Sequence, residues 1–323
     1  MYRVFSDFLK GKQKICVIQA ENPDGDSMGS AMALDFLLGD IKISLYCPVD
    51  VPKYLRYFRD WSRVSNEFDF KADGYIIVDT SAEVLLSKLL GDPAIRNRLY
   101  SAPVLVIDHH ETPDDLTFPH ESITEIRPAC AEVIYRIARS EGLEINLDAA
   151  EAIFQGILSD TLGLTSTSVT DETFEVAAEL TRLGADVSTL EERRREYMKK
   201  TPRILDFKAD LIKRIEYSLD GALATVHIPW EDIREYSDEY NPNVLILEEM
   251  RLVEGVRVAI AIKTYPDGKV TGKIRTTSDA PIAKEIAGYF GGGGHPQAAG
   301  FRTYDTTYEE VLRELIKILP GLM

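Results

Sequence analysis

Cysteine is scarce in this chain of 323 residues, which contains only three. Cys16, Cys47 and Cys130 lie far apart, and their number is odd. The sequence therefore holds neither a disulfide framework nor a CxxC site, and a reducing cytoplasm is the expected compartment.

Long apolar runs are also missing. No stretch approaches the roughly 18 to 20 consecutive apolar residues of a membrane helix. Asp7 and Lys10 interrupt the N-terminal segment, and no small-residue cleavage site follows it. We therefore predict neither a signal peptide nor association with a membrane.

Basic residues are outnumbered, with 37 Lys and Arg against 53 Asp and Glu, which gives a formal net charge of -16. A protein that grips long nucleic acid needs a basic surface to displace counterions, so long nucleic acid is not an expected partner. If the substrate is anionic, bound cations are expected to offset the carboxylates of the site.

The first half of the chain alternates between two patterns, and the whole is long enough for two domains. Strand-like apolar runs cover residues 14–19, 41–46, 75–78 and 104–107. Helical patterns cover residues 28–38, 83–90, 131–141 and 147–158. Such alternation predicts βαβ units and a parallel sheet. Asp171 is predicted to be the N-cap of a further helix.

The second half of the chain has a different pattern of strands and helices. Strand-like alternation covers residues 222–228, 256–264 and 271–275, and helical patterns cover residues 281–289 and 308–319. The predicted fold class is α/β. A parallel-sheet domain (1–188) is joined by a helical connector (189–215), broken at Pro202, to a smaller α/β domain (216–323) with a mixed or antiparallel sheet.

The segment VLVIDHH places Asp108, His109 and His110 directly after an apolar run. In open α/β sheets, ligands bind at the carboxyl ends of the strands. Other runs of the first half end in acidic residues too, and these are Asp24, Asp26, Asp79 and Asp160. A single Asp at such a place most often caps a helix or forms a turn. Together with imidazole, the set suits Mn²⁺, Mg²⁺ or Zn²⁺, and cations would keep crowded carboxylates ionised.

The run GGGGHPQAAG in the second half carries another candidate site. Consecutive glycines offer accessible backbone N–H groups, which favour an anion-binding turn over a flexible loop. His295 can add a charge-assisted hydrogen bond to a phosphate.

The motifs NPDGD-MGS, IIVDTS, VIDHH, ILSDT and GGGGHPQAAG resemble, in order and spacing, the DHH/DHHA1 phosphoesterase family. The likeness is greatest to its nanoRNase (oligoribonuclease), pAp-phosphatase and di-nucleotide phosphodiesterase group. It identifies residues 1–188 with the DHH domain and 216–323 with the DHHA1 domain. It also implies two divalent ions, Mn²⁺ above all, with the ligands Asp24, Asp26, Asp79, His109 and Asp160. Asp79 would bridge the ions.

The same resemblance implies roles beyond the metal ligands. Asp108 would orient an imidazole, while His110 and His295 would act on the substrate phosphate. The implied substrate-binding residues are Arg275, Gly292, Gly293, Gly294 and His295. For Arg275, an ordinary surface arginine at a hairpin end is an equally good interpretation.

One position departs from the family pattern. The nanoRNase group usually has a histidine four residues before the first Asp of DxD, where this chain has Ala20. We therefore expect one tight site, at Asp26, Asp79, His109 and Asp160, and a weaker, partly water-ligated one at Asp24 and Asp79. Glu21 is a candidate substitute ligand.

The resemblance implies hydrolysis of pApA, nanoRNA or cyclic di-AMP to mononucleotides, with pAp phosphatase activity as an addition. The alternatives are an inorganic pyrophosphatase or exopolyphosphatase, a RecJ-type exonuclease, and a nucleotide-binding sensor that has lost catalysis. Short nucleotides are the expected partners, and a homodimer is a possible assembly.

Overall fold

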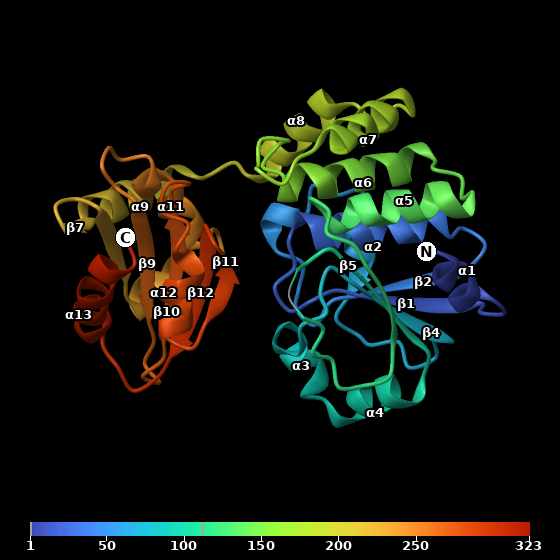
Figure 1. The fold of residues 1–323 in the computed structure, drawn as a ribbon, viewed down its shortest axis with the longest axis horizontal. Coiled ribbons are helices and arrows are strands. Elements are labelled where there is room, and N and C mark those ends of the chain that lie inside the picture. Colours follow the sequence, from blue (N-terminus) through green and yellow to red (C-terminus); the bar gives the residue numbers. More distant parts are fainter. Residues whose placement is uncertain (1, 112) are drawn as a thin grey trace. The chain divides into compact units, whose positions relative to one another are not determined.

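The computed structural model describes residues 2–111 and 113–323, and the chain divides into two compact units, Met1–Lys199 and Lys200–Met323 (Figure 1). The stretch predicted as a connector contains two helices, α8 (Val187–Tyr197) and α9 (Pro202–Lys213). Pro202 starts α9, where its fixed φ and missing N–H are tolerated, so the predicted break is a helix start.

The first unit is built on a six-stranded, all-parallel sheet in the order β3-β2-β1-β4-β5-β6. Its strands are β1 (Lys14–Ile18), β2 (Lys42–Tyr46), β3 (Val64–Ser65), β4 (Gly74–Val78), β5 (Val104–Asp108) and β6 (Glu121–Thr124). The parallel sheet is as predicted. The two short outer strands β3 and β6 lack the long apolar runs that identified the others, and the sequence interpretation missed them.

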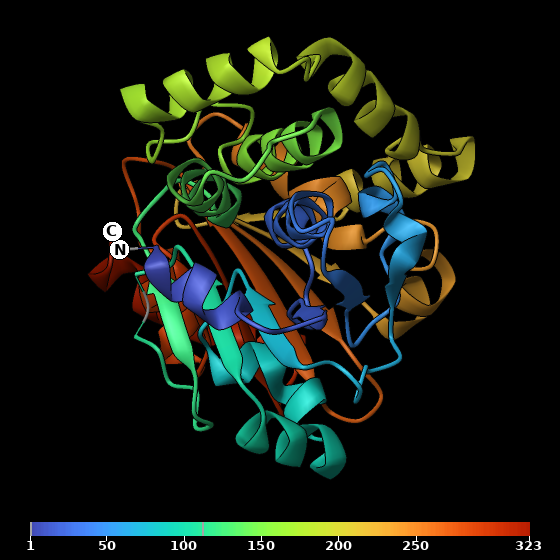
Figure 2. The same ribbon diagram turned by 90° about the vertical axis from the view of Figure 1, so that its right-hand side faces the viewer.

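Helices cover both faces of this sheet, with α2, α5 and α6 on one side and α3 and α4 on the other (Figures 1 and 2). The helices of the unit are α1 (Arg3–Leu9), α2 (Gly25–Leu37), α3 (Ser87–Leu90), α4 (Pro93–Ser101), α5 (Cys130–Glu141), α6 (Leu147–Asp160), α7 (Asp171–Arg182) and α8. The N-cap prediction for Asp171 is wrong. Thr170 is the N-cap, because its extended backbone lets its hydroxyl accept the N–H of Thr173.

Helices α2 and α6 cross at small residues. A Cβ atom added to Gly29 would lie 2.6 Å from the Ala152 carbonyl oxygen and 2.8 Å from Gly156 Cα. A Cβ added to Gly156 would lie 2.6 Å from Ala131 Cβ and 3.0 Å from the Asp26 carboxylate. The close approach brings the start of α2 and the end of α6 to the same edge of the sheet.

The second unit contains a six-stranded sheet in the order β11-β12-β10-β9-β8-β7. Only β8 and β9 pair in parallel among its described neighbours, so the sheet is mixed, as predicted. Its strands are β7 (Glu216–Ser218), β8 (Leu223–Ile228), β9 (Val258–Thr264), β10 (Val270–Thr276), β11 (Gly293–His295) and β12 (Ala298–Thr303).

Helices α9, α10 (Trp230–Tyr236) and α11 (Pro242–Arg251) pack on one side of this second sheet. Helices α12 (Ala283–Tyr289) and α13 (Tyr308–Ile318) pack on the other. The three cysteines of the chain are buried and unbridged. Within residues 2–111 and 113–323, no helix has the length and apolar character needed to cross a membrane.

Candidate metal centre

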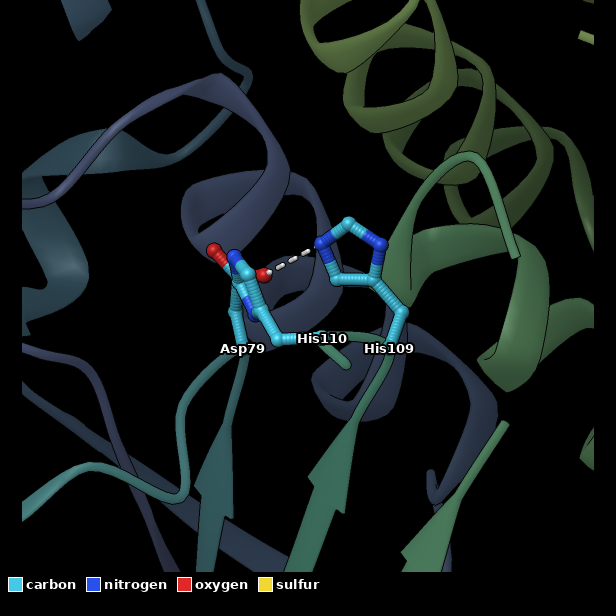
Figure 3. A group of neighbouring side chains, drawn as sticks. All are labelled: Asp79, His109 and His110. Carbon is cyan, nitrogen blue, oxygen red and sulfur yellow. Dashed lines mark ion pairs between the residues drawn. The ribbon is translucent and has the colours of Figure 1, made fainter. Parts of the chain in front are cut away.

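The carboxyl ends of β4 and β5 bring Asp79 and His109 together. The two strands are neighbours in parallel register, so Asp79 and the residue after Asp108 leave the sheet side by side. His109 Nε2 lies 3.3 Å from Asp79 Oδ1 (Figure 3). Asp79 has a φ of 65°, a conformation uncommon outside glycine that is often found at functional sites.

Two more carboxylates reach the same imidazole from helix ends. His109 Nε2 lies 3.7 Å from Asp26 Oδ2 on α2 and 3.5 Å from Asp160 Oδ2, the last residue of α6. Asp26, His109 and Asp160 form one set of potential donor atoms within 4.8 Å of one another, and Asp79, His109 and His110 form a second. The structure therefore brings Asp26, Asp79 and Asp160 around one imidazole, and Asp160 reaches it from the end of a helix.

The segment before and at the start of α5 fixes two of these side chains. The Arg127 carbonyl oxygen lies 2.8 Å from His109 Nδ1. The N–H groups of Cys130 and Ala131 donate to the two oxygens of Asp26, at 2.6 and 2.9 Å. These are main-chain groups, so no side-chain pattern in the sequence could have revealed them.

Asp108 orients the neighbouring histidine. Its Oδ1 atom accepts from the His109 main-chain N–H and lies 2.8 Å from His110 Nδ1. Its Oδ2 atom accepts from the Ser81 hydroxyl at 2.8 Å. Burial alone would raise the pKa of Asp108, but the bonds from His110 and Ser81 outweigh it and lower the pKa. The imidazole that Asp108 holds directly is that of His110, since His109 Nδ1 faces Arg127.

The carboxylates around His109 are held out of water with too little positive charge. Burial, followed by the charges of Asp26 and Asp24, raises the pKa of Asp160 to about 8. Burial and the other carboxylates raise the pKa of Asp79 well above its usual value. Burial disfavours a charge on His109, but Asp26 and the other acids prevail and raise its pKa. Added cations would relieve this repulsion and favour the ionised carboxylates.

Two buried atoms that lack hydrogen bonds fit a divalent metal. Asp79 Oδ1 and His109 Nε2 are buried and have no hydrogen-bond partner among the described residues. Buried polar atoms without partners are rare in folded proteins and call for an explanation. Carboxylate oxygen and neutral imidazole together suit Mn²⁺, Mg²⁺ or Zn²⁺, so Asp26, Asp79, His109 and Asp160 could hold such an ion.

Asp24 and Glu21 have other local functions. Asp24 is the N-cap of α2, and its Oδ1 accepts the N–H groups of Asp26 and Ser27. Its charge still reaches the cluster, because it contributes to the raised pKa values of Asp79 and Asp160. Glu21 Oε2 accepts from the Ser87 hydroxyl and the Lys88 N–H at the start of α3. These two hydrogen bonds give Glu21 a structural role and argue against Glu21 as a substitute metal ligand.

The glycine run of the second unit is only partly an open turn. Gly291 has a φ of 74°, and its N–H donates to the Gly288 carbonyl oxygen while the Gly292 N–H donates to that of Ala287. This pattern is a Schellman cap on α12. The expectation that the whole run offers unoccupied N–H groups to an anion is wrong for Gly291 and Gly292.

The remaining candidate residues of this unit lie on two strands. Gly293, Gly294 and His295 form the exposed strand β11, paired with β12. Arg275 lies on β10 opposite Ala298 of β12, and Ala298 in turn lies opposite His295 of β11. The structure thus aligns Arg275 and His295 on one sheet face, while their roles toward a substrate stay predictions.

Comparisons with known proteins agree with this organisation. The family model of the DHH family, N-terminal domain, matches residues 14–157, and that of the DHHA1 domain matches residues 236–322. The chain is similar to the bifunctional oligoribonuclease and PAP phosphatase NrnA of Thermus thermophilus, with 28% identity covering 96% of this chain and 92% of that protein. It is also similar to the protein of the same description from Bacillus subtilis, with 23% identity covering 87% of each.

A solved structure extends the likeness to the fold. The crystal structure of an exopolyphosphatase-related protein from Bacteroides fragilis superposes with a TM-score of 0.85, covering 99% of this chain and 97% of that one. At 20% identity, this likeness concerns the fold alone. The two matched domains stand in the expected order and account for most of the sequence, and the chain therefore belongs to the DHH/DHHA1 phosphoesterase family.

Proposed function

We propose that this protein is a divalent-metal-dependent phosphodiesterase, with Mn²⁺ as the activating ion, that hydrolyses very short oligoribonucleotides such as pApA to mononucleotides. The similarity to proteins described as oligoribonucleases and PAP phosphatases supports short RNA as the substrate and pAp as a second one. Cyclic di-AMP is a further candidate for the same site.

One observation carries the proposal. His109 Nε2 faces carboxylate oxygens of Asp26, Asp79 and Asp160 at 3.3 to 3.7 Å, and it makes no hydrogen bond with a described residue. An imidazole surrounded by three carboxylates, of which Asp26 and Asp79 are buried, is costly unless a cation joins them. A bound divalent ion would lower the pKa of a water ligand toward neutrality and stabilise charge on a phosphate oxygen.

The side chains around the cluster have distinct tasks in this reaction. Asp108 accepts from one nitrogen of His110, which fixes the ring and orients its other nitrogen for a phosphate oxygen. Arg127 and α5 hold His109 and Asp26 in place, so little reorganisation is needed when a substrate binds.

A substrate panel tests the proposal. Purified protein is incubated with Mn²⁺ and pApA, a short RNA, a long RNA, cyclic di-AMP or pAp, and mononucleotide release is followed by chromatography. We expect the highest kcat/KM for the shortest linear RNAs. Asp79→Asn should reduce release at least about a hundredfold, because metal ions supply several kcal/mol of transition-state stabilisation.

Asp60→Asn is the matched control. Asp60 also has a positive φ, of 56°, but it is exposed and lies outside the cluster, so the same charge loss should leave turnover unchanged. Equal activity of Asp79→Asn and wild type would contradict the metal mechanism. Tight binding of these nucleotides by wild type without any turnover would favour the sensor alternative.

A further inference from the structure

Leu162 has a main-chain conformation that leucine rarely adopts. Its φ is 52°, in the left-handed region, where a Cβ atom crowds the following carbonyl oxygen and which glycine, asparagine and aspartate occupy more easily. Such conformations persist only where the surrounding structure enforces them, and they are frequent at functional sites. Leu162 follows Asp160 by two residues, so this strain lies next to the metal centre.

Hydrogen bonds of the turn after α6 enforce the conformation. The Gly163 N–H donates to the Leu158 carbonyl oxygen at 2.8 Å, and the Leu162 N–H donates to that of Ser159 at 3.4 Å. This is a Schellman cap with leucine at the position that glycine usually fills. The preceding Thr161 is buried, and its hydroxyl donates to a main-chain carbonyl in the last turn of α6. These bonds fix the Leu162 main chain at the end of the helix.

Packing within the chain does not account for a leucine here. Two other described leucines have a positive φ, Leu164 at 66° and Leu219 at 54°. Leu164 packs against a core of the first unit and Leu219 against a core of the second, so burial of each side chain offsets the strain. Leu162 is 73% exposed and belongs to none of the apolar clusters within residues 2–111 and 113–323. An exposed leucine alone is ordinary, but a strained one without packing calls for another cause.

The place of Leu162 in the first unit suggests that cause. Asp160 Oδ2 lies 3.5 Å from His109 Nε2, and two residues of chain span at most about 7 Å. At the other nitrogen of the same ring stands the Arg127 carbonyl oxygen, and the residue before it, Ile126, is 70% exposed. Exposed aliphatic residues therefore neighbour the groups that contact both nitrogens of His109.

An aliphatic side chain beside a phosphate-processing site suits a nucleotide. Nucleobases bound by proteins are commonly held against aromatic or apolar side chains. Ligand sites in general combine such apolar surfaces with a few polar groups. The acidic cluster and its cations would take the phosphate, and Leu162 supplies an apolar surface next to them. Inorganic phosphate and pyrophosphate have no apolar part that could use this surface.

We propose that Leu162 is a substrate-binding residue whose side chain contacts the base of the nucleotide that has its phosphate at the metal centre. This inference rests on the proposed function, and it adds a residue that selects nucleotides over phosphates without a base. The base covers the leucine when the substrate binds, and the apolar area buried in that contact offsets the strain of the turn.

Two monophosphates separate the base from the phosphate. AMP and ribose 5-phosphate share the phosphate and the ribose, and AMP alone carries adenine. Binding of each to the full-length protein in Mn²⁺ is measured by calorimetry, and neither contains the phosphodiester that the proposed reaction cleaves. We expect AMP to bind at least about tenfold more tightly than ribose 5-phosphate, because contact of a base with a side-chain surface typically has an effect of this size.

Two variants of Leu162 test the contact. Leu162→Asn keeps a residue that tolerates the left-handed conformation but replaces the apolar surface, and Leu162→Gly removes the side chain. Both should weaken AMP binding about tenfold and leave ribose 5-phosphate binding within about twofold of wild type. In EDTA, Leu162→Gly should raise the midpoint of thermal unfolding by about 2 °C, because the strain is relieved.

Asp60→Gly is the matched control. Asp60 has nearly the same φ, 56°, and is exposed, but it lies outside the acidic cluster. Its replacement by glycine relieves the same kind of conformation, so AMP and ribose 5-phosphate should both bind as they do to wild type.

The outcomes separate this inference from the proposed function. Equal AMP affinity of Leu162→Asn and wild type, or equal losses of affinity for AMP and ribose 5-phosphate, would overturn the base contact even if oligonucleotide turnover is normal. A lower unfolding temperature of Leu162→Gly would also overturn it, because the leucine would then serve the fold. Absent turnover of every oligonucleotide together with a Leu162-dependent preference for AMP would overturn the phosphodiesterase instead.

Discussion

His109 Nδ1 lies 2.8 Å from the main-chain carbonyl oxygen of Arg127. A carbonyl oxygen can only accept, so this contact places a proton on Nδ1 and leaves Nε2 of the neutral ring available to a metal ion. The side chain of Arg127 is in turn paired with Glu125 and Glu172. An ion-pair network thus fixes a ring orientation that no sequence motif specifies.

Arg127→Ala should weaken metal binding without removing a ligand. Loss of the pairs to Glu125 and Glu172 frees the segment that carries the carbonyl, and such supporting contacts are typically worth 10- to 100-fold in metal affinity. Titration of Mn²⁺ by electron paramagnetic resonance measures the effect. Arg139→Ala is the control and should bind Mn²⁺ like wild type, because it removes an exposed arginine of α5 that pairs with Glu179 on α7, the helix that also carries Glu172.

The metal-free protein should lose stability as pH rises from about 4 to about 8. The pKa of Asp160 is raised from 3.8 to about 8, so between these values the folded state binds more protons than the unfolded state. Stability must then fall with increasing pH, and the raised pKa values of Asp79 and His109 act in the same direction. Thermal unfolding in EDTA at pH 5 and pH 8 measures the change.

Asp160→Asn isolates the contribution of that one carboxyl. The variant should unfold at a higher temperature than wild type at pH 8 in EDTA, and the difference should shrink at pH 5, where wild-type Asp160 is protonated. Excess Mn²⁺ should stabilise wild type more at pH 8 than at pH 5, since ligands must be deprotonated to bind it. A variant less stable than wild type at pH 8 would refute the assigned repulsion.

Gly156→Ala should destabilise the protein by about 1–3 kcal/mol, the usual cost of overpacking. The added Cβ would lie 2.6 Å from Ala131 Cβ and 3.0 Å from the Asp26 carboxylate, so α6 would have to move. Gly288→Ala on α12 is the control. No atom lies within 4 Å of its added Cβ, and alanine favours helix, so stability should stay equal or rise. Denaturant unfolding compares both variants, and equal effects would exclude close packing as the cause.

Ala20→His should lower the Mn²⁺ concentration needed for half-maximal activity, because it supplies an imidazole at the position where the nanoRNase group usually has a histidine. Ala20 is buried two residues after the end of β1, so added volume alone could perturb the site. Ala20→Leu supplies similar bulk without a donor atom and should not lower the requirement. Coinciding titration curves for Ala20→His and wild type would mean that the missing histidine has no effect on metal loading.

The apolar runs of β1, β2, β4 and β5 were long enough to predict the parallel sheet and the edge at which its strands end. That edge in turn predicted the proximity of Asp79 and His109, because parallel strands present their carboxyl ends on one side. The short strand β6 and the helices α4 and α11, whose apolar residues show only weak helical periodicity, escaped prediction, since neither period nor length distinguishes them from loops.

The sequence by itself determined features that lie within one short segment. These are the helix cap at Asp24, the run Asp108-His109-His110 after a buried strand, and the glycine turn after α12. Tertiary structure alone decided which nitrogen of His109 faces the acids and how closely α2 and α6 approach. The physical reason is that these features depend on main-chain groups and on contacts between segments distant along the chain. The local pattern of residue types does not show which distant segments come into contact, and the folded structure does.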